Sequence, residues 1–203
     1  MPGPMRQQNG YAGVRLGTGP EAVVAIMRPM AFTGRHVSPC GPQGRRSLRL
    51  PDHDYRRPGA YFVTICAKDR ARQFGVIISG AVRLSRAGRI AHELWLTIPR
   101  HFSHVQLDEF VIMPDHVHGI LKLLANPDDR PRLRRFADAV PGSLSTIIGA
   151  YKAEVTKRVN ALRDAAGESV WQRNFYEHVI RSPRALQAIR TYIRDNPRRW
   201  TLE

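Results

Sequence analysis

Two histidines separated by one residue, His116 and His118, have the clearest chemical potential in this sequence. The segment around them is rich in apolar and β-branched residues, which predicts a strand. Residues two apart on a strand project from one face, so both imidazoles are expected on one side and Val117 on the other, in a core. Two neutral imidazoles on one rigid strand can provide half of the ligands of a metal ion. The alternative is a polar strand face that carries two histidines without a ligand.

A second chemical pair lies near the end of the chain. Ser182 suits the N-cap of a helix, Pro183 suits its first position, and Pro197 is expected to end it. Tyr192 and Asn196 are four residues apart, so they lie one turn apart and can present a phenol and an amide to the same point. The alternatives are that Tyr192 only packs and that Asn196 is an ordinary C-cap.

Positive charge is abundant, with 32 Lys and Arg against 17 Asp and Glu, a formal net charge of +15. This excess predicts a polyanionic partner, first of all nucleic acid. Arg190 and Arg194 are also one helical turn apart, which costs roughly 0.2–0.5 kcal/mol in an isolated helix. A bound phosphate would turn that repulsion into attraction. The candidate DNA contacts are Lys152, Arg173, Arg190 and Arg194, and the alternative for each is an ordinary surface charge.

Several classes of protein are disfavoured. No apolar run approaches the ~18 residues that span a bilayer, and the first residues lack a charged-then-apolar secretory signal. The two cysteines, Cys40 and Cys66, form neither a disulfide framework nor a Cys-rich zinc site. These features predict a cytoplasmic protein that does not bind membranes. Cys66 lies in an apolar run and is expected to be buried.

The remaining pattern predicts an α+β fold, with an antiparallel sheet and helices packed on one face. Apolar residues at helical spacing predict helices at 89–98 and 143–163. Apolar and aromatic runs predict strands at 60–67, 110–113, 117–124 and 170–180, and a hairpin at 76–84 that turns at Ser79-Gly80.

Two domain-level regions are expected. Residues 44–203 carry the periodic pattern and should form one ordered domain. Residues 1–43 are dense in Gly and Pro and are expected to be a flexible N-terminal extension, in which Met27 and Met30 are alternative starts. Within the domain, residues 126–141 are rich in arginine and are expected to form a polar loop.

Three segments, taken in order, resemble the single-tyrosine HUH transposases (His, hydrophobic residue, His). Residues 113–121, MPDHVHGIL, resemble the HUH motif. Residues 171–181, WQRNFYEHVIR, resemble a segment typical of the REP-associated tyrosine transposase branch. Residues 189–197, IRTYIRDNP, resemble the family's nucleophile helix. In addition to these three segments, residues 45–66 resemble the family's opening. The similarity covers residues 44 to 200 and leaves residues 1–43 without a counterpart.

The resemblance implies a ferredoxin-like α+β fold, which agrees with the pattern above. It also implies cleavage and rejoining of single-stranded or hairpin DNA, with Tyr192 forming a 5′-phosphotyrosine and releasing a 3′-hydroxyl. A divalent metal would be held by His116, His118 and Asn196. Imidazole favours transition metals and Mg²⁺ prefers oxygen, so this mixed donor set suits Mn²⁺ or Mg²⁺.

Some alternatives stay open. Tyr176, which is close to His178, is the rival nucleophile, although Tyr192 has the amide four residues later and the flanking arginines. Asp115 stands where the family more often has Asn, so the charge beside the metal differs. A basic nucleic-acid-binding protein without catalysis would explain the charge but not the His pair. A domesticated relative would keep the same active site, and the family includes monomers and dimers, so a homodimer is also compatible.

Overall fold

The computed structural model describes residues 54–125 and 141–200. Four antiparallel strands form the main sheet in the order β4-β5-β1-β6. Helix α2 (Arg86–His101) joins β1 to β4, and helix α3 (Leu144–Arg163) joins β5 to β6. This βαββαβ sequence with its two central strands β5 and β1 is the ferredoxin-like arrangement, so the predicted α+β fold is confirmed. The strands are β1 (Gly59–Cys66), β4 (Val105–Ile112), β5 (His116–Leu123) and β6 (Tyr176–Ile180).

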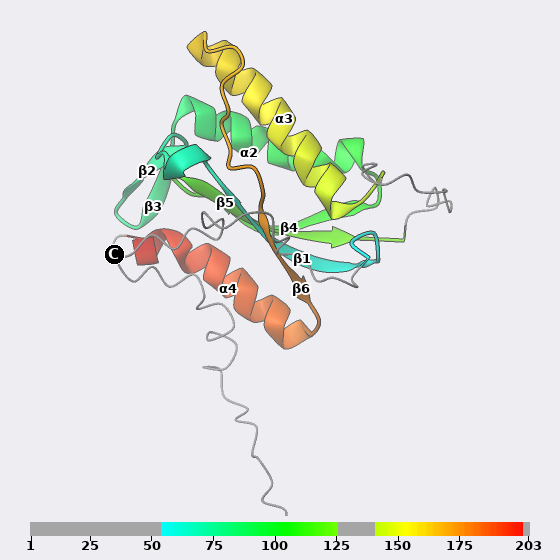
Figure 1. Cartoon of the computed structure of the whole chain (residues 1–203). Coiled ribbons are helices and arrows are strands. Elements are labelled where there is room, and N and C mark those ends of the chain that lie inside the picture. Colours follow the sequence, from blue (N-terminus) through cyan, green and yellow to red (C-terminus); the bar gives the residue numbers. More distant parts are fainter. Residues whose placement is uncertain (1–53, 126–140, 201–203) are drawn as a thin grey trace, which may run out of the picture. The chain divides into compact units, whose positions relative to one another are not determined.

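The sheet separates two packing layers (Figure 1). Helices α2 and α3 cover one face and share a hydrophobic core with it, including Trp95, Val117 and Ile147. The closing helix, α4 (Pro183–Trp200), lies against the other face, where it contacts β4 and β5. Ile189 and Ile193 of α4 are buried there. The prediction that the helices pack on one face therefore holds for α2 and α3, whereas α4 lies on the other face, which carries the two histidines.

Local signals placed several element boundaries closely, although the strand predicted at 110–113 begins earlier, at Val105, and the helix predicted at 89–98 spans Arg86–His101. Ser143 is the N-cap of α3, and its side chain accepts from the Thr146 N–H at 3.3 Å. The predicted hairpin is β2 (Gly75–Ile78) and β3 (Ala81–Leu84), which pair only with each other in the part of the chain that the structure describes. Its turn residues Ser79 and Gly80 have φ values of 51° and 73°, as a tight two-residue hairpin turn requires.

The prediction that Pro197 ends the last helix is wrong, because α4 continues through it to Trp200. The alternative that Asn196 is a C-cap is wrong for the same reason. Proline removes one backbone hydrogen bond from a helix. Here Asn196 and Pro197 are buried, and the ring of Trp200 lies 5.7 Å from that of His116. Tertiary packing therefore outweighs the local preference.

The predicted strand at 170–180 is correct only in its last part, where Tyr176–Ile180 pairs with β1. Trp171 makes an isolated bridge with Ala67, and the residues between are irregular. Lys152 explains this, because its Nζ donates to the carbonyl oxygens of Gln172, Arg173 and Asn174 at 2.6, 3.2 and 3.4 Å. Carbonyls that converge on one ammonium group do not form a strand ladder.

Some expectations concern residues outside the described ranges. These are the extension at 1–43, the start of the domain near residue 44, Cys40, and the arginines of the loop at 126–141. Within the described ranges, no helix is long and apolar enough to cross a membrane. Cys66 is buried as predicted, and its sulfur accepts from Arg70 Nη1 at 3.0 Å.

Gly119→Ala should destabilise the fold by about 1–3 kcal/mol, the usual cost of overpacking a core. A Cβ at Gly119 would lie 2.3 Å from a ring carbon of Trp95, which is fully buried. Gly149→Ala is the matched control, because no atom lies within 4 Å of its added Cβ in the exposed face of α3. That change should stabilise by about 0.5–1 kcal/mol. Urea denaturation measures both, and equal midpoints would refute the packing argument.

Candidate active site

Strand β5 begins with the histidine pair. Val117 is fully buried in the core shared with α2 and α3. His116 and His118 project from the opposite face, as strand alternation requires, and are 4% and 2% exposed. Their ring centroids are 4.3 Å apart. The two imidazoles therefore lie side by side beneath α4.

Each imidazole is oriented through its Nδ1 atom. Nδ1 of His116 lies 2.6 Å from Asp115 Oδ1, and the other oxygen of Asp115 pairs with Arg70 Nε at 2.9 Å. An ionised carboxylate only accepts, so this Nδ1 carries a proton, and when the ring is neutral Nε2 carries the lone pair. Nδ1 of His118 lies 2.9 Å from Thr64 Oγ1. When that Nδ1 donates to Thr64, both rings present Nε2, which is the usual arrangement of metal-binding histidines.

The protonation state of His118 suits a metal ligand. Burial lowers its pKa well below the usual value of histidine, and the nearby His116 and Arg70 lower it further. A neutral imidazole keeps a lone pair at neutral pH, whereas an imidazolium ion cannot bind a cation. A neutral His118 therefore keeps a lone pair that a metal ion could use.

Helix α4 brings Tyr192 to this pair. The phenol oxygen lies 3.4 Å from Nε2 of His118, and the two ring centroids are 5.3 Å apart. Phe62 of β1 packs against both rings, at 5.3 Å from His118 and 6.2 Å from Tyr192. Residues 74 positions apart in the sequence thus meet across the sheet–helix interface.

Asn196 lies between two contacts of α4 with the histidines. One turn before it, Tyr192 meets His118, and one turn after it, the ring of Trp200 lies near that of His116. Asn196 is itself only 8% exposed. Helical spacing therefore places Asn196 on the same face of α4 as Tyr192 and Trp200.

The donor set fits a divalent ion only when oxygen ligands are included. No three His, Cys, Asp or Glu side chains cluster as a metal site within residues 54–125 and 141–200. Two imidazole nitrogens and one amide oxygen are three neutral donors, and water or a phosphate would have to complete the shell. Such an incomplete shell is typical of catalytic rather than structural metal centres.

Tyr176, the rival nucleophile, also projects from the histidine face. It pairs with Thr64, which in turn pairs with His118, and directly opposed residues share a face. Its ring packs edge-on against Phe62 at 6.4 Å, and burial raises the pKa of its phenol. Thr64 of β1 therefore lies between Tyr176 and His118 on this face of the sheet, whereas Tyr192 contacts His118 directly.

The four basic residues proposed to bind DNA have different environments. Lys152 holds three carbonyl oxygens, and Arg190 makes two 2.7 Å hydrogen bonds to Asp108. Arg194 lies 3.9 Å from Glu109 with its side chain 52% exposed, and Arg173 is exposed. Arg173 and Arg194 thus remain accessible to a polyanion, whereas Lys152 and Arg190 have structural partners within the chain.

Several residues of the site were not found from the sequence. Thr64 and Phe62 are ordinary strand residues, and their roles depend on pairing with β5 and packing against α4. Arg70 follows Asp69 in a short turn where both residues have positive φ, and this turn directs Arg70 to Asp115. Positive φ in non-glycine residues is uncommon and has no sequence signal here. The negative charge of Asp115, which stands where the resembled family more often has Asn, is thus balanced by the nearby guanidinium of Arg70.

Two curated relatives come from Haemophilus influenzae. An uncharacterized protein is 37% identical over 163 residues, which are 77% of this chain and 89% of the relative. A candidate REP-associated tyrosine transposase is 27% identical over 145 residues, 71% of this chain and 73% of the relative. No family model matches the sequence.

Two solved structures are also similar. One is a REP-associated tyrosine transposase bound to a REP hairpin, with 19% identity, a TM-score of 0.49, and coverage of 78% of this chain and 73% of that one. The other is a candidate transposase from Deinococcus radiodurans, with 16% identity, a TM-score of 0.42, and coverage of 71% and 94%.

Proposed function

We propose that this chain is a REP-associated tyrosine transposase that cleaves and rejoins single-stranded DNA with Tyr192 as nucleophile, and its similarity to a candidate member of that family supports the proposal. The observation that supports this most directly is the 3.4 Å approach of the Tyr192 hydroxyl to Nε2 of His118, beside a second, buried imidazole. A nucleophile within reach of oriented groups is the expected feature of covalent catalysis.

The proposed reaction is a transesterification. The Tyr192 oxygen attacks the scissile phosphorus, the bond from phosphorus to the 3′-oxygen breaks, and a 5′-phosphotyrosine and a 3′-hydroxyl result. The phenol loses a proton and the departing 3′-oxygen gains one. One phosphate ester replaces another, so the reverse reaction can join the strand without ATP, and the sequence contains no Gly-x-x-x-x-Gly-Lys-Ser/Thr loop.

His116, His118 and Asn196 would hold Mg²⁺ or Mn²⁺ in this site. Such an ion would polarise a non-bridging phosphate oxygen and stabilise the developing charge on the departing 3′-oxygen. All three donors are neutral, so they do not reduce the attraction for the phosphate. Phe62 packs beside Tyr192 and excludes water from one side of the phenol.

The chain's net charge of +15 supports a DNA partner. We propose hairpin DNA with a flanking single strand as substrate in the cytoplasm, with exposed Arg173 and Arg194 among the phosphate contacts. The homodimer compatible with the family stays a prediction. Binding through phosphates should weaken steeply as salt rises.

An adduct assay tests the proposal. The full chain is incubated with labelled, hairpin-bearing single-stranded DNA and Mn²⁺ or Mg²⁺, and the products are separated in SDS. We expect a labelled band that survives SDS and disappears after protease treatment. If DNA binds but no covalent band forms with either metal over a library of hairpins, the protein is a non-catalytic DNA-binding module.

Thr64→Val should slow adduct formation about 10–100-fold, the usual effect of removing a group that orients a metal-binding histidine. Valine keeps the shape of Thr64 but cannot bond to Nδ1 of His118, 2.9 Å away. Raising the Mn²⁺ concentration should restore part of the rate. Thr97→Val is the matched control, because Thr97 bonds only to the Leu94 carbonyl of its own helix in the contacts described. Equal rates for the two variants would contradict the proposed role.

A further inference from the structure

Strand β4 contains a β-bulge that changes the direction of two acidic side chains. Leu107 pairs with Leu121 and Phe110 with Gly119, so Asp108 and Glu109 together stand opposite a single residue of β5. Leu107 and Phe110 both pack against the core shared with α2 and α3. Without the extra residue, positions three apart on a strand would project from opposite faces. The bulge thus directs both carboxylates toward α4.

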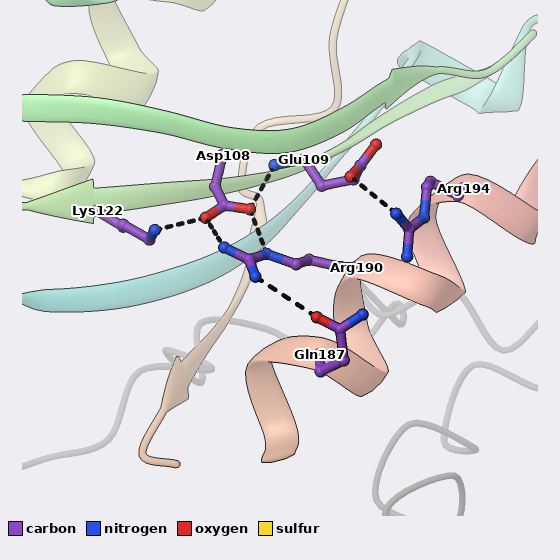
Figure 2. A network of polar contacts seen from close by, with 6 residues as sticks. All are labelled: Asp108, Glu109, Lys122, Gln187, Arg190 and Arg194. Carbon is purple, nitrogen blue, oxygen red and sulfur yellow. Dashed lines mark hydrogen bonds and ion pairs between the residues drawn. The ribbon is translucent and has the colours of Figure 1, made fainter. Parts of the chain in front are cut away.

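Two arginines of α4 meet these carboxylates (Figure 2). Arg190 forms a two-pronged pair with Asp108, in which Nε and Nη2 each lie 2.7 Å from a carboxylate oxygen. Lys122 of β5 lies 2.6 Å from the same carboxylate, whose side chain is only 8% exposed. One turn later, Arg194 lies 3.9 Å from Glu109. The like charges on α4 therefore have partners within the chain.

The Asp108–Arg190 pair is the strong member of this network. The hydrogen bonds from Arg190, followed by those from Lys122, hold the pKa of Asp108 far below its usual range, so it stays ionised at neutral pH. Removing one partner from a buried ion pair leaves an uncompensated charge. A two-pronged guanidinium–carboxylate contact also fixes the relative orientation of both groups.

This pair lies on the opposite flank of α4 from the nucleophile. At 100° per residue, Arg190 and Tyr192 are separated by about 160° around the helix. Ile189 and Ile193, both buried, lie between them on the face toward the sheet. Apolar burial is not directional, so these isoleucines by themselves allow α4 to roll or slide. A two-pronged ion pair is directional, so one on the flank of α4 would restrict that motion.

We propose that Asp108 and Arg190 form a latch, here the α4 latch, that sets the rotation of α4 and thereby positions Tyr192 against His118. The proposal that this pair sets the rotation of α4 rests on the contacts of α4 alone. The proposal that it thereby affects cleavage rests on the proposed function. Asp108 is a positioning residue, because it acts on Tyr192 only through the helix. A displacement of about 1 Å at a reacting group can cost about a hundredfold in rate.

Asp108→Asn in the full chain tests the latch in two independent ways. Amide hydrogen exchange in α4 should become about tenfold faster or more while exchange in α3 is unchanged. The single-turnover rate of adduct formation should fall about 10–100-fold, with DNA affinity within about twofold of the parent. Glu154→Gln is the matched control, because it removes an exposed carboxylate that pairs with Arg158 at 2.8 Å on α3. It should change neither readout.

Arg190 provides a second variant, with a side chain that is 31% exposed and more tolerant of change. Arg190→Gln should match Asp108→Asn, and Arg190→Lys should fall between Arg190→Gln and the parent. In the double variant Asp108→Asn/Arg190→Gln, the loss should equal that of one change, because the two residues act as a unit. The latch would be overturned, in favour of direct DNA contact, if the rate losses of the two single variants multiplied in the double variant. A loss of DNA affinity as large as the loss of rate would overturn it in the same way.

The outcomes separate the latch from the proposed function. Unchanged α4 exchange in Asp108→Asn refutes the latch, whatever happens to cleavage. Faster α4 exchange in a protein whose parent never forms an adduct supports the latch and refutes the transesterase activity.

Discussion

Tyr192→Phe should abolish the covalent protein–DNA adduct, a loss of at least about 1,000-fold, because phenylalanine has no oxygen to bond to phosphorus. The ring should stay in place, since its packing against Phe62 at 6.2 Å does not involve the hydroxyl. DNA affinity should therefore remain within about twofold, because phosphate contacts come from other residues. The adduct gel and a fluorescence anisotropy titration with the same labelled hairpin measure the two quantities.

Tyr176→Phe is the matched control for that experiment. Tyr176 projects from the same sheet face, and burial raises the pKa of its phenol. Its loss should leave adduct yield unchanged. An adduct that persists in Tyr192→Phe and is missing in Tyr176→Phe would assign the nucleophile to Tyr176 instead.

His116→Ala should reduce the rate of adduct formation at least about a hundredfold, with a much smaller effect on DNA affinity. The variant loses the Nε2 atom proposed as a metal ligand. It also removes the ring that bonds to Asp115, while the ion pair of Asp115 with Arg70 at 2.9 Å remains. Chelation of divalent ions should abolish cleavage by the parent, and added Mn²⁺ should restore it. Mn²⁺ binding, followed by electron paramagnetic resonance, should weaken in His116→Ala.

His104→Ala controls for the loss of a buried imidazole. His104 is 7% exposed and bonds to the Gly142 carbonyl at 2.9 Å, near the opposite end of β5 from His116. It should reduce stability without changing Mn²⁺ binding or the cleavage rate at a temperature where both variants are folded. If His116→Ala lost DNA affinity and cleavage equally, a folding defect would explain the result, and unaltered Mn²⁺ binding would exclude His116 as a ligand.

Two interpretations made from the sequence changed once partners were visible. The i, i+4 repulsion of Arg190 and Arg194 suggested a phosphate, yet the carboxylates of Asp108 and Glu109 already offset it. Pro197 suggested a helix end, yet α4 continues to Trp200. Both depend on residues distant in sequence: Asp108 and Arg190 are 82 positions apart. Local pattern contains no information about such partners.

Features that depend on a few consecutive residues could be predicted from residue order alone. Strand alternation places His116 and His118 on one face and Val117 on the other, and helical spacing places Tyr192 and Asn196 one turn apart. Backbone sterics and hydrogen bonding act over this short range, so their consequences can be read from residue order.

The sequence pattern did not predict which elements face one another, and the folded domain shows it. In the folded domain α4 packs on the histidine face, and Thr64 lies within hydrogen-bond distance of Nδ1 of His118. A bulge in β4 directs Asp108 toward Arg190. Each of these contacts depends on strand register and helix rotation, which are fixed by the packing of the whole domain at once. A change of one residue in register would exchange the faces of the strand while leaving every local signal in the sequence the same.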